Sequence, residues 1–206
     1  MEIAFGATKH LVMILSILSM KKIMFNDRFG LTQAVLDGRK TQTRRGIKYG
    51  INVNSCNDAL ELSTYKVGEV VAVAQSYRKA GVEVVGAKGY GQYMSAPIYV
   101  NSTAGWNNKM FVKAELMPHH IKITNVRIEK LQDITKSDCL AEGIEKWYDE
   151  DIASYYYHLP NQDHLEVEDL HRTPRDAYAT LIDKISGKGT WERNPFMWVY
   201  EFELID

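Results

Sequence analysis

Residues 20–45, MKKIMFNDRFGLTQAVLDGRKTQTRR, contain the clearest succession of elements in the chain. The apolar segment 22–25 predicts a short strand, and the apolar positions within 29–36 have the three- to four-residue spacing of a helix. Gly38 follows directly, where a glycine commonly ends a helix. Residues 39–48 then contain five basic residues and no acidic one. The stretch therefore predicts a strand, a helix and a basic connection, in that order.

The rest of the chain adds more strands than helices. Strands are predicted by β-branched and alternating segments over 70–74, 110–116, 120–128 and 196–204. Helices are predicted over 136–141, with Thr135 as N-cap and Asp138 three residues on, and over 174–185, with Pro174 at the first position. The strands are not separated by regular crossover helices, so the pattern favours an α+β mixed barrel with flanking helices over a doubly wound parallel sheet.

Length and charge limit the class of protein. The 206 residues fit one domain over 20–206 with long insertions near 75–109 and 145–172. The formal net charge is −1, so the whole chain is not a polycation, and nucleic-acid contact would need a local basic patch. Two cysteines without zinc-site spacing indicate free thiols in a cytoplasmic protein.

The strongly apolar run of the sequence is residues 11–20, LVMILSILSM. Ten residues form about 15 Å of helix, half of a bilayer core, so we expect no membrane span. A strand is predicted directly after the run, which suggests that Met20 is the true start and that 1–19 are a gene-start extension. The alternative is an additional N-terminal helix packed on the domain.

Three segments, taken in order, resemble a known family. GRKTQTRR (38–45) follows a predicted strand and helix, the helix 131–144 follows another strand, and WVYEF (198–202) lies in the last strand. The chain thereby resembles the ASCH domain, a member of the PUA-like β-barrel superfamily, and more narrowly the long ASCH proteins of bacterial and prophage genomes. The resemblance covers 20–74 and 110–206. It implies a PUA-like mixed β-barrel that binds a nucleoside, a nucleotide or RNA in a basic cleft.

One branch of this family offers a chemical comparison. The small bacterial amidohydrolases that act on N4-acetylcytidine have a catalytic lysine and threonine three residues apart after the glycine, and a glutamate in the later helix. By this resemblance Lys40 is the base, Thr43 the nucleophile and Glu142 the proton donor. The residues implied to bind or orient the substrate are Arg39, Arg44 and Arg45.

The chemistry of these residue types is consistent with amide hydrolysis, which needs a nucleophile, a base and a donor for the leaving amine. A lysine acts as a base only when its amine is neutral, and burial or neighbouring cations lower its pKa in that direction. A partly buried glutamate can protonate the departing amine. Positions i and i+3 of a regular strand point to opposite faces, so the catalytic interpretation predicts irregular backbone over 40–43.

Three other interpretations remain open. The basic run can be a solvated loop without a reaction. It can instead contact RNA phosphates through Arg39, Lys40, Arg44, Arg45 and Lys48, with bases stacked on Tyr49, Tyr77 or Trp198, although Trp198 within the last strand is more typical of a core residue. In the third interpretation the chain is a phage-encoded protein-interaction factor, with an exposed apolar patch on one of the two insertions.

Other reactive side chains are weaker candidates. His119 and His120 are adjacent on a predicted strand and so point to opposite faces. The segment Tyr155–Tyr157 is interpreted as a packing lid or an interface patch, and Cys139 is expected to face the core. A solvated acidic loop is predicted for His158, Asp163, His164, Glu168 and His171. The sequence therefore predicts neither a metal site nor a cofactor.

Overall fold

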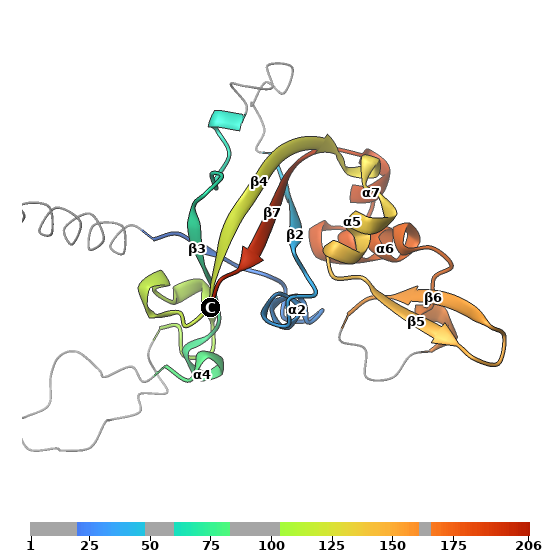
Figure 1. Ribbon diagram of the computed structural model, residues 1–206, viewed down its shortest axis with the longest axis horizontal. Coiled ribbons are helices and arrows are strands. Elements are labelled where there is room, and N and C mark those ends of the chain that lie inside the picture. Colours follow the sequence, from blue (N-terminus) through green and yellow to red (C-terminus); the bar gives the residue numbers. More distant parts are fainter. Residues whose placement is uncertain (1–19, 48–59, 83–103, 161–165) are drawn as a thin grey trace, which may run out of the picture. The chain divides into compact units, whose positions relative to one another are not determined.

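The computed structural model describes residues 20–47, 60–82, 104–160 and 166–206 (Figure 1). The predicted extension over 1–19 lies outside these ranges, as do Lys48, Tyr49, Asp163 and His164. The chain divides into two compact units, which we describe separately. The first comprises residues up to Phe25 together with 70–121 and Asp206, and the second comprises 26–69 and 122–205.

The first unit is built around a short parallel strand pair. β1 (Lys22–Ile23) pairs with β3 (Val70–Val73), with Lys22 opposite Ala72. The helical turn α4 (Tyr77–Ala80) follows β3. The buried side chains that pack together here are Ala72, Ala74, Tyr77, Val112, Ala114 and Met117. Tyr77, considered above as a base-stacking residue, is therefore part of this core.

The strand predicted over 110–116 is wrong. The structure has two turns of 3-10 helix there, η1 (Lys109–Phe111) and η2 (Ala114–Leu116). The ammonium group of Lys22 donates hydrogen bonds to the carbonyls of Met110 and Val112, at 2.7 and 2.6 Å. These carbonyls thus bind a side chain rather than a neighbouring strand, which the alternating sequence pattern cannot reveal.

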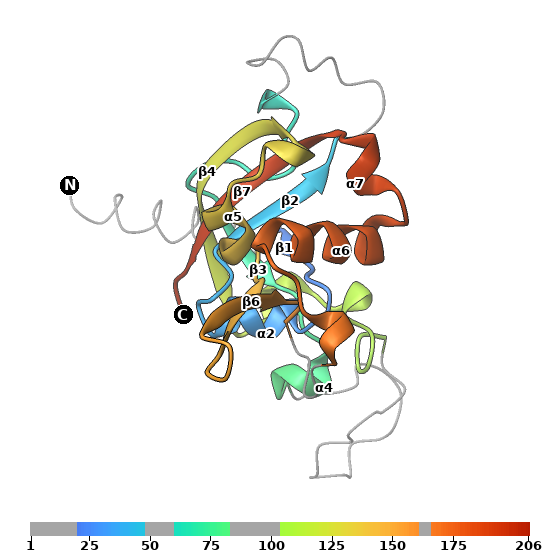
Figure 2. The same cartoon turned by 90° about the vertical axis from the view of Figure 1, so that its right-hand side faces the viewer.

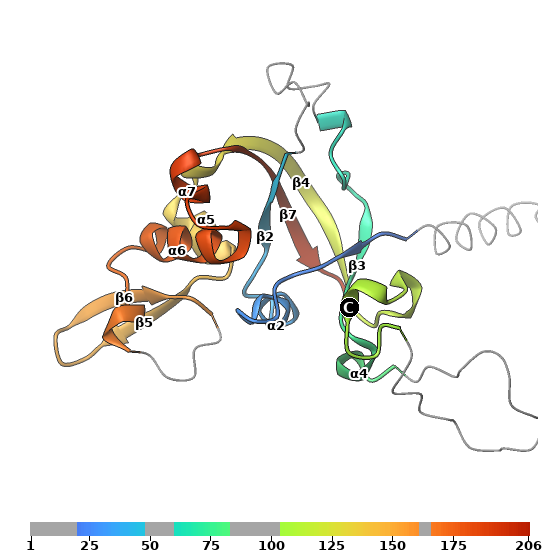
Figure 3. The same ribbon diagram turned by 180° about the vertical axis from the view of Figure 1, so that it is seen from behind.

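In the second unit, β2 (Gln42–Gly46) lies antiparallel to β7 (Phe196–Leu204), and β4 (His120–Lys130) lies on the other side of β7. Figures 2 and 3 show these three strands side by side. The register places Gln42 opposite Glu201 and Thr43 opposite Tyr200. Trp198 is buried, which confirms the prediction that it is a core residue.

The strands follow the hydrogen-bonded order β1-β3-β4-β7-β2, with parallel and antiparallel pairs. The order ends at β1 and β2, so the described strands form an open mixed sheet. The closed barrel expected from the sequence is therefore corrected to an open sheet, whereas the α+β class with flanking helices is confirmed.

The second unit contains α2 (Leu31–Leu36), α5 (Lys136–Ala141), α6 (Pro174–Ser186) and the single turn α7 (Thr190–Arg193). α5 begins at Thr135, whose hydroxyl accepts from the Asp138 amide while the Asp138 carboxylate accepts from the Thr135 amide. The predicted N-cap Thr135 of α5 and the predicted first-position Pro174 of α6 are both confirmed.

The second predicted insertion forms an antiparallel hairpin that the sequence did not indicate. β5 (Glu145–Asp149) pairs with β6 (Ser154–His158), and η4 (Val167–Asp169) follows. Aromatic residues occupy both faces of this hairpin, so its sequence lacks the apolar and polar alternation that identifies a half-buried strand. η3 (Leu131–Asp133) connects β4 to α5.

None of the helices in the described ranges combines the length and the apolar composition that a membrane span requires.

Candidate functional site

The segment between α2 and β2 positions Lys40. Gly38 has φ +71°, a left-handed conformation that favours glycine, and it directs the chain out of α2. The Lys40 amide donates to a carbonyl of α2 at 2.8 Å, and the Thr41 amide donates to the last carbonyl of α5 at 2.9 Å. The backbone is irregular through Thr41 and becomes regular strand at Gln42. The irregular segment expected over 40–43 therefore ends after Thr41.

The Lys40 side chain is buried and its ammonium group is fully hydrogen-bonded. Nζ lies 2.6 Å from Oε2 of Glu142, 2.7 Å from the Glu142 carbonyl and 2.7 Å from the Gln42 carbonyl. The exposed fractions of the two side chains are 1% for Lys40 and 6% for Glu142. Because an ammonium group has three hydrogens, these three acceptors satisfy it completely.

The stem of Lys40 runs past Gly143, the residue after Glu142. Gly143 has φ +103°, and a Cβ atom added there would lie 3.2 Å from Leu31 Cδ2 and 3.7 Å from Lys40 Cδ. Only glycine combines this backbone conformation with so close an approach. Gly143 therefore allows the lysine stem to pass between α2 and the end of α5.

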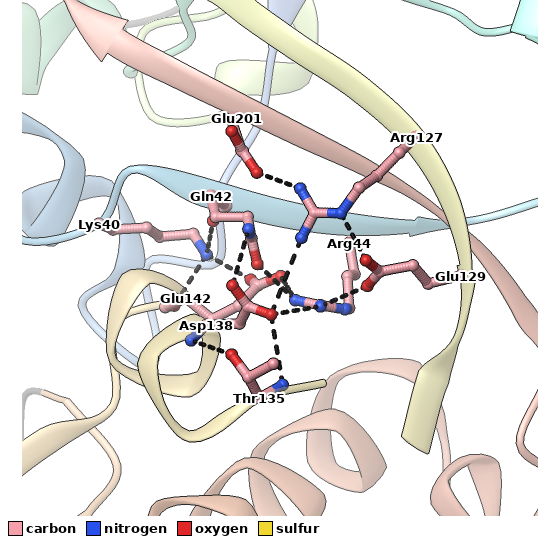
Figure 4. Close-up of polar contacts among 9 residues, drawn as sticks. All are labelled: Lys40, Gln42, Arg44, Arg127, Glu129, Thr135, Asp138, Glu142 and Glu201. Carbon is pink, nitrogen blue, oxygen red and sulfur yellow. Dashed lines mark hydrogen bonds and ion pairs between the residues drawn. The ribbon is translucent and has the colours of Figure 1, made fainter. Parts of the chain in front are cut away.

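Arg44 continues the buried polar cluster on the same face of β2 as Gln42. Its Nη1 donates to Gln42 Oε1 at 2.6 Å and to Glu142 Oε1 at 3.2 Å, and its Nη2 donates to Glu129 Oε2 at 2.9 Å. The Arg44 side chain is fully buried. Glu142 thus binds Lys40 with one carboxylate oxygen and Arg44 with the other (Figure 4).

Asp138 joins the cluster from the first turn of α5. The amide of Gln42 donates to Asp138 Oδ1 at 3.2 Å, and Nη2 of Arg44 lies 3.4 Å from Oδ2. Burial alone would raise the pKa of Asp138, but hydrogen bonds from Thr135 and Gln42 and the charge of Arg44 hold it below its ordinary value. The Asp138 carboxylate is therefore ionised at neutral pH.

Arg127 of β4 completes the cluster. Its guanidinium contacts Glu129 and Glu201 and lies 3.8 Å from Asp138. We call the whole set the Glu142 network, whose members are Lys40, Gln42, Arg44, Arg127, Glu129, Thr135, Asp138, Glu142 and Glu201 (Figure 4). It contains three cationic and four anionic side chains, so the positive charges of Lys40 and Arg44 are neutralised within the protein.

The two buried cations respond differently to this environment. Burial lowers the pKa of the Lys40 amine, and the carboxylate of Glu142 offsets this in part. Burial opposes ionisation of Arg44 as well, but Glu142 and the other acidic side chains around it raise its pKa above the ordinary value. Lys40 is therefore the group of the pair from which a proton is more readily removed.

Thr43 does not lie with Lys40 and Glu142. The contact between Gln42 and Arg44 shows that these two side chains share one face of β2, and strand alternation places Thr43 on the opposite face. There it lies opposite Tyr200, whose hydroxyl accepts from the Thr64 amide. The structure thus brings together the base and the acid implied by the family resemblance, but not the nucleophile.

The other predicted substrate-binding residues also lie apart from Arg44. Arg39 is exposed and pairs with Asp37 at 2.9 Å and with Glu145 at 2.5 Å. Arg45 is half-buried and, by strand alternation, shares the face of Thr43. Arg39, Arg44 and Arg45 therefore do not form one basic surface.

A hollow of about 320 Å³ opens beside the Glu142 network, and we call it the Gln42 hollow. Its lining residues are Thr41, Gln42, Thr124, Ser137, Asp138, Ala141, Glu201 and Phe202. The lining thus combines hydroxyl groups, an amide, two carboxylates and an apolar wall, and it includes neither lysine nor arginine. Lys40 and Glu142 lie behind this lining.

The remaining sequence candidates are structural. His158 is buried, and its Nδ1 lies 2.9 Å from the Leu159 carbonyl, whereas a solvated loop was expected. His120 pairs with Asp206 at 2.6 Å. Cys139 is buried as predicted, and burial raises the pKa of its thiol to about 12. In the described ranges, no three histidine, cysteine or acidic side chains are grouped as a metal site would require.

Sequence reasoning missed several members of the network. Asp138 was predicted only as a helix cap, and Gln42 lay within the basic run without an assigned role. Arg127, Glu129 and Glu201 carried no signal, because the alternation of β4 is imperfect beyond Thr124 and their partners are distant along the chain.

Comparison with known proteins identifies no family. Neither the protein-family models nor the curated proteins include a match. Among solved structures, the chain is similar to the crystal structure of protein EF3133 from Enterococcus faecalis V583, assigned to family DUF984. The two share 13% identity and a TM-score of 0.35, over 85% of this chain and 67% of that one. A likeness this distant does not establish a shared fold or function.

Proposed function

We propose that the Gln42 hollow binds the base of a nucleoside, and that the chain is a nucleoside-binding protein of the ASCH type. One observation carries this proposal: the hollow offers hydrogen-bond acceptors and donors beside an apolar wall, without a cationic side chain in its lining. Its volume of about 320 Å³ falls in the range of small-molecule sites.

The polar lining suits the edge of an amino-bearing base such as cytosine. The ionised carboxylate of Asp138 accepts hydrogen bonds and can take one from an exocyclic amino group. The side-chain amide of Gln42 has a second hydrogen and a second lone pair beyond its bonds to Asp138 and Arg44, and these match the mixed pattern along a base edge. Phe202 and Ala141 supply apolar surface for the ring.

A nucleoside fits the lining better than a nucleotide or RNA. Asp138 and Glu201 line the hollow, and the Glu142 network to which they belong holds four anionic side chains against three cationic ones, a balance that disfavours a phosphate group. Arg44, which would contact phosphates in the RNA-binding interpretation, is buried and paired with acidic side chains. Affinity in the Gln42 hollow is therefore expected to come from the base and sugar, with little dependence on salt.

Calorimetric titration with cytidine and cytidine monophosphate tests this proposal. The wild type should bind cytidine more tightly than the monophosphate, and Asp138→Asn should weaken cytidine binding about tenfold, the value of one charge-assisted hydrogen bond. Asp176→Asn is the matched control, because Asp176 occupies the same position in a threonine-capped helix outside the hollow. Equal loss in both variants, or tighter binding of the monophosphate, would contradict the assignment.

A second candidate activity is hydrolysis of an N4-acylated cytidine. The observation that favours it is the contact of 2.6 Å between Lys40 and Glu142, with the pKa of the lysine lowered by burial. Incubation with N4-acetylcytidine should then release acetate, and Lys40→Met and Glu142→Gln should each abolish the release. Release of acetate by both variants would show that neither Lys40 nor Glu142 is needed for catalysis.

The variant Thr43→Val tests whether Thr43 is the nucleophile, as the family resemblance implies. The resemblance assigns the nucleophile to Thr43, so this variant should be inactive if that role applies. The strand register places Thr43 on the face away from Glu142, and a fully active Thr43→Val would assign the nucleophile elsewhere. The hydroxyl groups that line the hollow are those of Thr41, Thr124 and Ser137. Cytoplasmic location and independence of a cofactor remain predictions from the sequence.

A further inference from the structure

The hairpin β5–β6 exposes aromatic side chains that its own unit does not cover. Trp147, Tyr148 and Tyr155 are 39%, 45% and 51% exposed, and Ile152 in the turn is 54% exposed. The base of the hairpin is fixed, because Tyr157 exchanges two backbone hydrogen bonds with His171, at 2.9 and 2.8 Å. Figures 1 and 3 show the turn at the end away from α5 and α6. The hairpin therefore holds its aromatic rings in fixed positions while leaving them accessible.

Each face of the hairpin carries one aromatic pair. On one face Trp147 and Tyr156 have ring centroids 6.0 Å apart, and on the other Tyr148 and Tyr155 have centroids 4.7 Å apart. Strand pairing places the members of each pair directly opposite one another. These contacts order the rings before a partner binds, which reduces the entropy lost on association.

One tyrosine of each pair already contacts a cation. Nζ of Lys146 lies 3.6 Å from the ring centroid of Tyr155, and Cζ of Arg172 lies 4.4 Å from that of Tyr156. Trp147 and Tyr148 are the other members of the two pairs, and each is exposed. Indole and phenol rings attract guanidinium and ammonium groups through their faces.

The charge around the rings selects a cationic partner. The hairpin, residues 145–158, contains the four acidic residues Glu145, Asp149, Glu150 and Asp151 against the single basic residue Lys146. Glu150 and Asp151 are exposed in the turn. A carboxylate beside an aromatic ring suits arginine in particular, since the planar guanidinium can stack on the ring and pair with the acid. The same acidic side chains would repel the phosphates of a nucleic acid.

We infer that the hairpin β5–β6 is a docking surface for an arginine-rich segment of a partner protein. Trp147 and Tyr148 receive guanidinium groups on the two faces, and Glu150 and Asp151 attract the segment to the turn. This surface does not depend on the Gln42 hollow, and the two proposals can fail independently.

Fluorescence anisotropy of labelled nona-arginine, titrated with the full chain, tests this inference. Trp147→Ala/Tyr148→Ala should raise the dissociation constant about tenfold, as expected for two exposed cation–π contacts. Phe111→Ala is the control for loss of an exposed aromatic ring, since Phe111 is 61% exposed in the other unit, and it should leave the constant unchanged. Equal binding by the wild type and the double variant would overturn the proposal.

A second pair of variants separates the docking surface from general attraction to an acidic protein. Glu150→Gln/Asp151→Asn should weaken nona-arginine binding severalfold, whereas Glu115→Gln/Glu203→Gln, the same change of charge at exposed positions elsewhere, should not. Nona-lysine should bind more weakly than nona-arginine. Equal effects of the two charge pairs, or tighter binding of a labelled oligouridylate than of nona-arginine, would contradict an arginine-rich partner.

Discussion

The contact between Lys40 and Glu142 makes a quantitative prediction for the stability of the second unit. Lys40→Met removes the ammonium group and leaves Glu142 with Arg44, which lies 3.2 Å away, as its remaining cation. Glu142→Gln leaves two buried cations without this carboxylate. Breaking a buried ion pair lowers the free energy of unfolding by about 3–5 kcal/mol. We expect a loss near the lower value for Lys40→Met and near the upper value for Glu142→Gln.

The double variant Lys40→Met/Glu142→Gln should cost less than the sum of the single changes. Neither an uncompensated ammonium group nor an uncompensated carboxylate remains at this contact, and the glutamine oxygen can still accept from Arg44. A coupling free energy of about 1–3 kcal/mol is expected for two buried side chains in contact. Urea unfolding of the wild type, the two single variants and the double variant measures this coupling, provided that the dependence of the unfolding free energy on urea concentration is the same in all four.

An exposed pair of the same residue types is the control for this cycle. Lys122 and Glu203 lie 3.9 Å apart, with side chains 49% and 57% exposed. Their coupling should be no more than about 1 kcal/mol. Additive costs for Lys40 and Glu142, or single losses below about 1 kcal/mol, would refute the assignment of a tightly coupled buried pair.

Three further changes probe the surroundings of the network. Gly143→Ala should destabilise the protein by about 2 kcal/mol more than Gly187→Ala, since both glycines have positive φ but only the first has neighbours within 4 Å of an added Cβ; equal unfolding free energies would contradict this. The pKa of Asp138 is lowered in the folded state, so its stabilisation is complete above the unfolded pKa and is lost as pH falls through the folded value. Unfolding midpoints of wild type and Asp138→Asn should therefore differ at pH 6 and converge toward pH 2, and a constant difference would count against ionisation of this carboxylate. In a Cys56→Ser background, Cys139, whose thiol pKa is about 12, should react with Ellman's reagent at pH 8 only as fast as the protein opens, and immediate labelling would contradict its burial.

Elements with a strong periodic pattern could be predicted from the sequence. The helix expected over 174–185 is α6 (Pro174–Ser186), and that expected over 136–141 has the same bounds in α5. Both begin at a threonine whose hydroxyl accepts a backbone hydrogen bond, and this local chemistry needs no distant contact. Local signals therefore fixed the starts of the helices that carry Asp138 and Asp176.

The burial of Lys40 and Arg44 within the basic run could not be predicted. Charged runs usually face solvent, yet the Arg44 side chain is fully buried, because its carboxylate partners come from β4 and α5, 85 to 98 positions further along the chain. The sequence shows that acidic residues exist there but not that they lie beside β2. The expectation that these charged side chains face solvent therefore failed because of contacts between segments that are distant in the sequence.

The open end of the sheet has a similar cause. Arg44 and Gln42 direct their side chains to Asp138 in the first turn of α5, and the carbonyl of Gln42 accepts from Lys40. A side chain thus satisfies a backbone group that another strand would satisfy in a closed barrel. A sequence pattern predicts that a strand exists, but not whether the backbone groups at its edge bond to another strand or to side chains.

The base-binding role of the Gln42 hollow is tested most directly by two-dimensional amide NMR during titration with cytidine. If cytidine binds in the hollow, the largest chemical-shift changes should appear at the side-chain amide of Gln42 and at the backbone amides of Ser137 and Asp138, and cytidine monophosphate should produce smaller changes. Shifts that spare all three of these positions at millimolar cytidine would contradict this role.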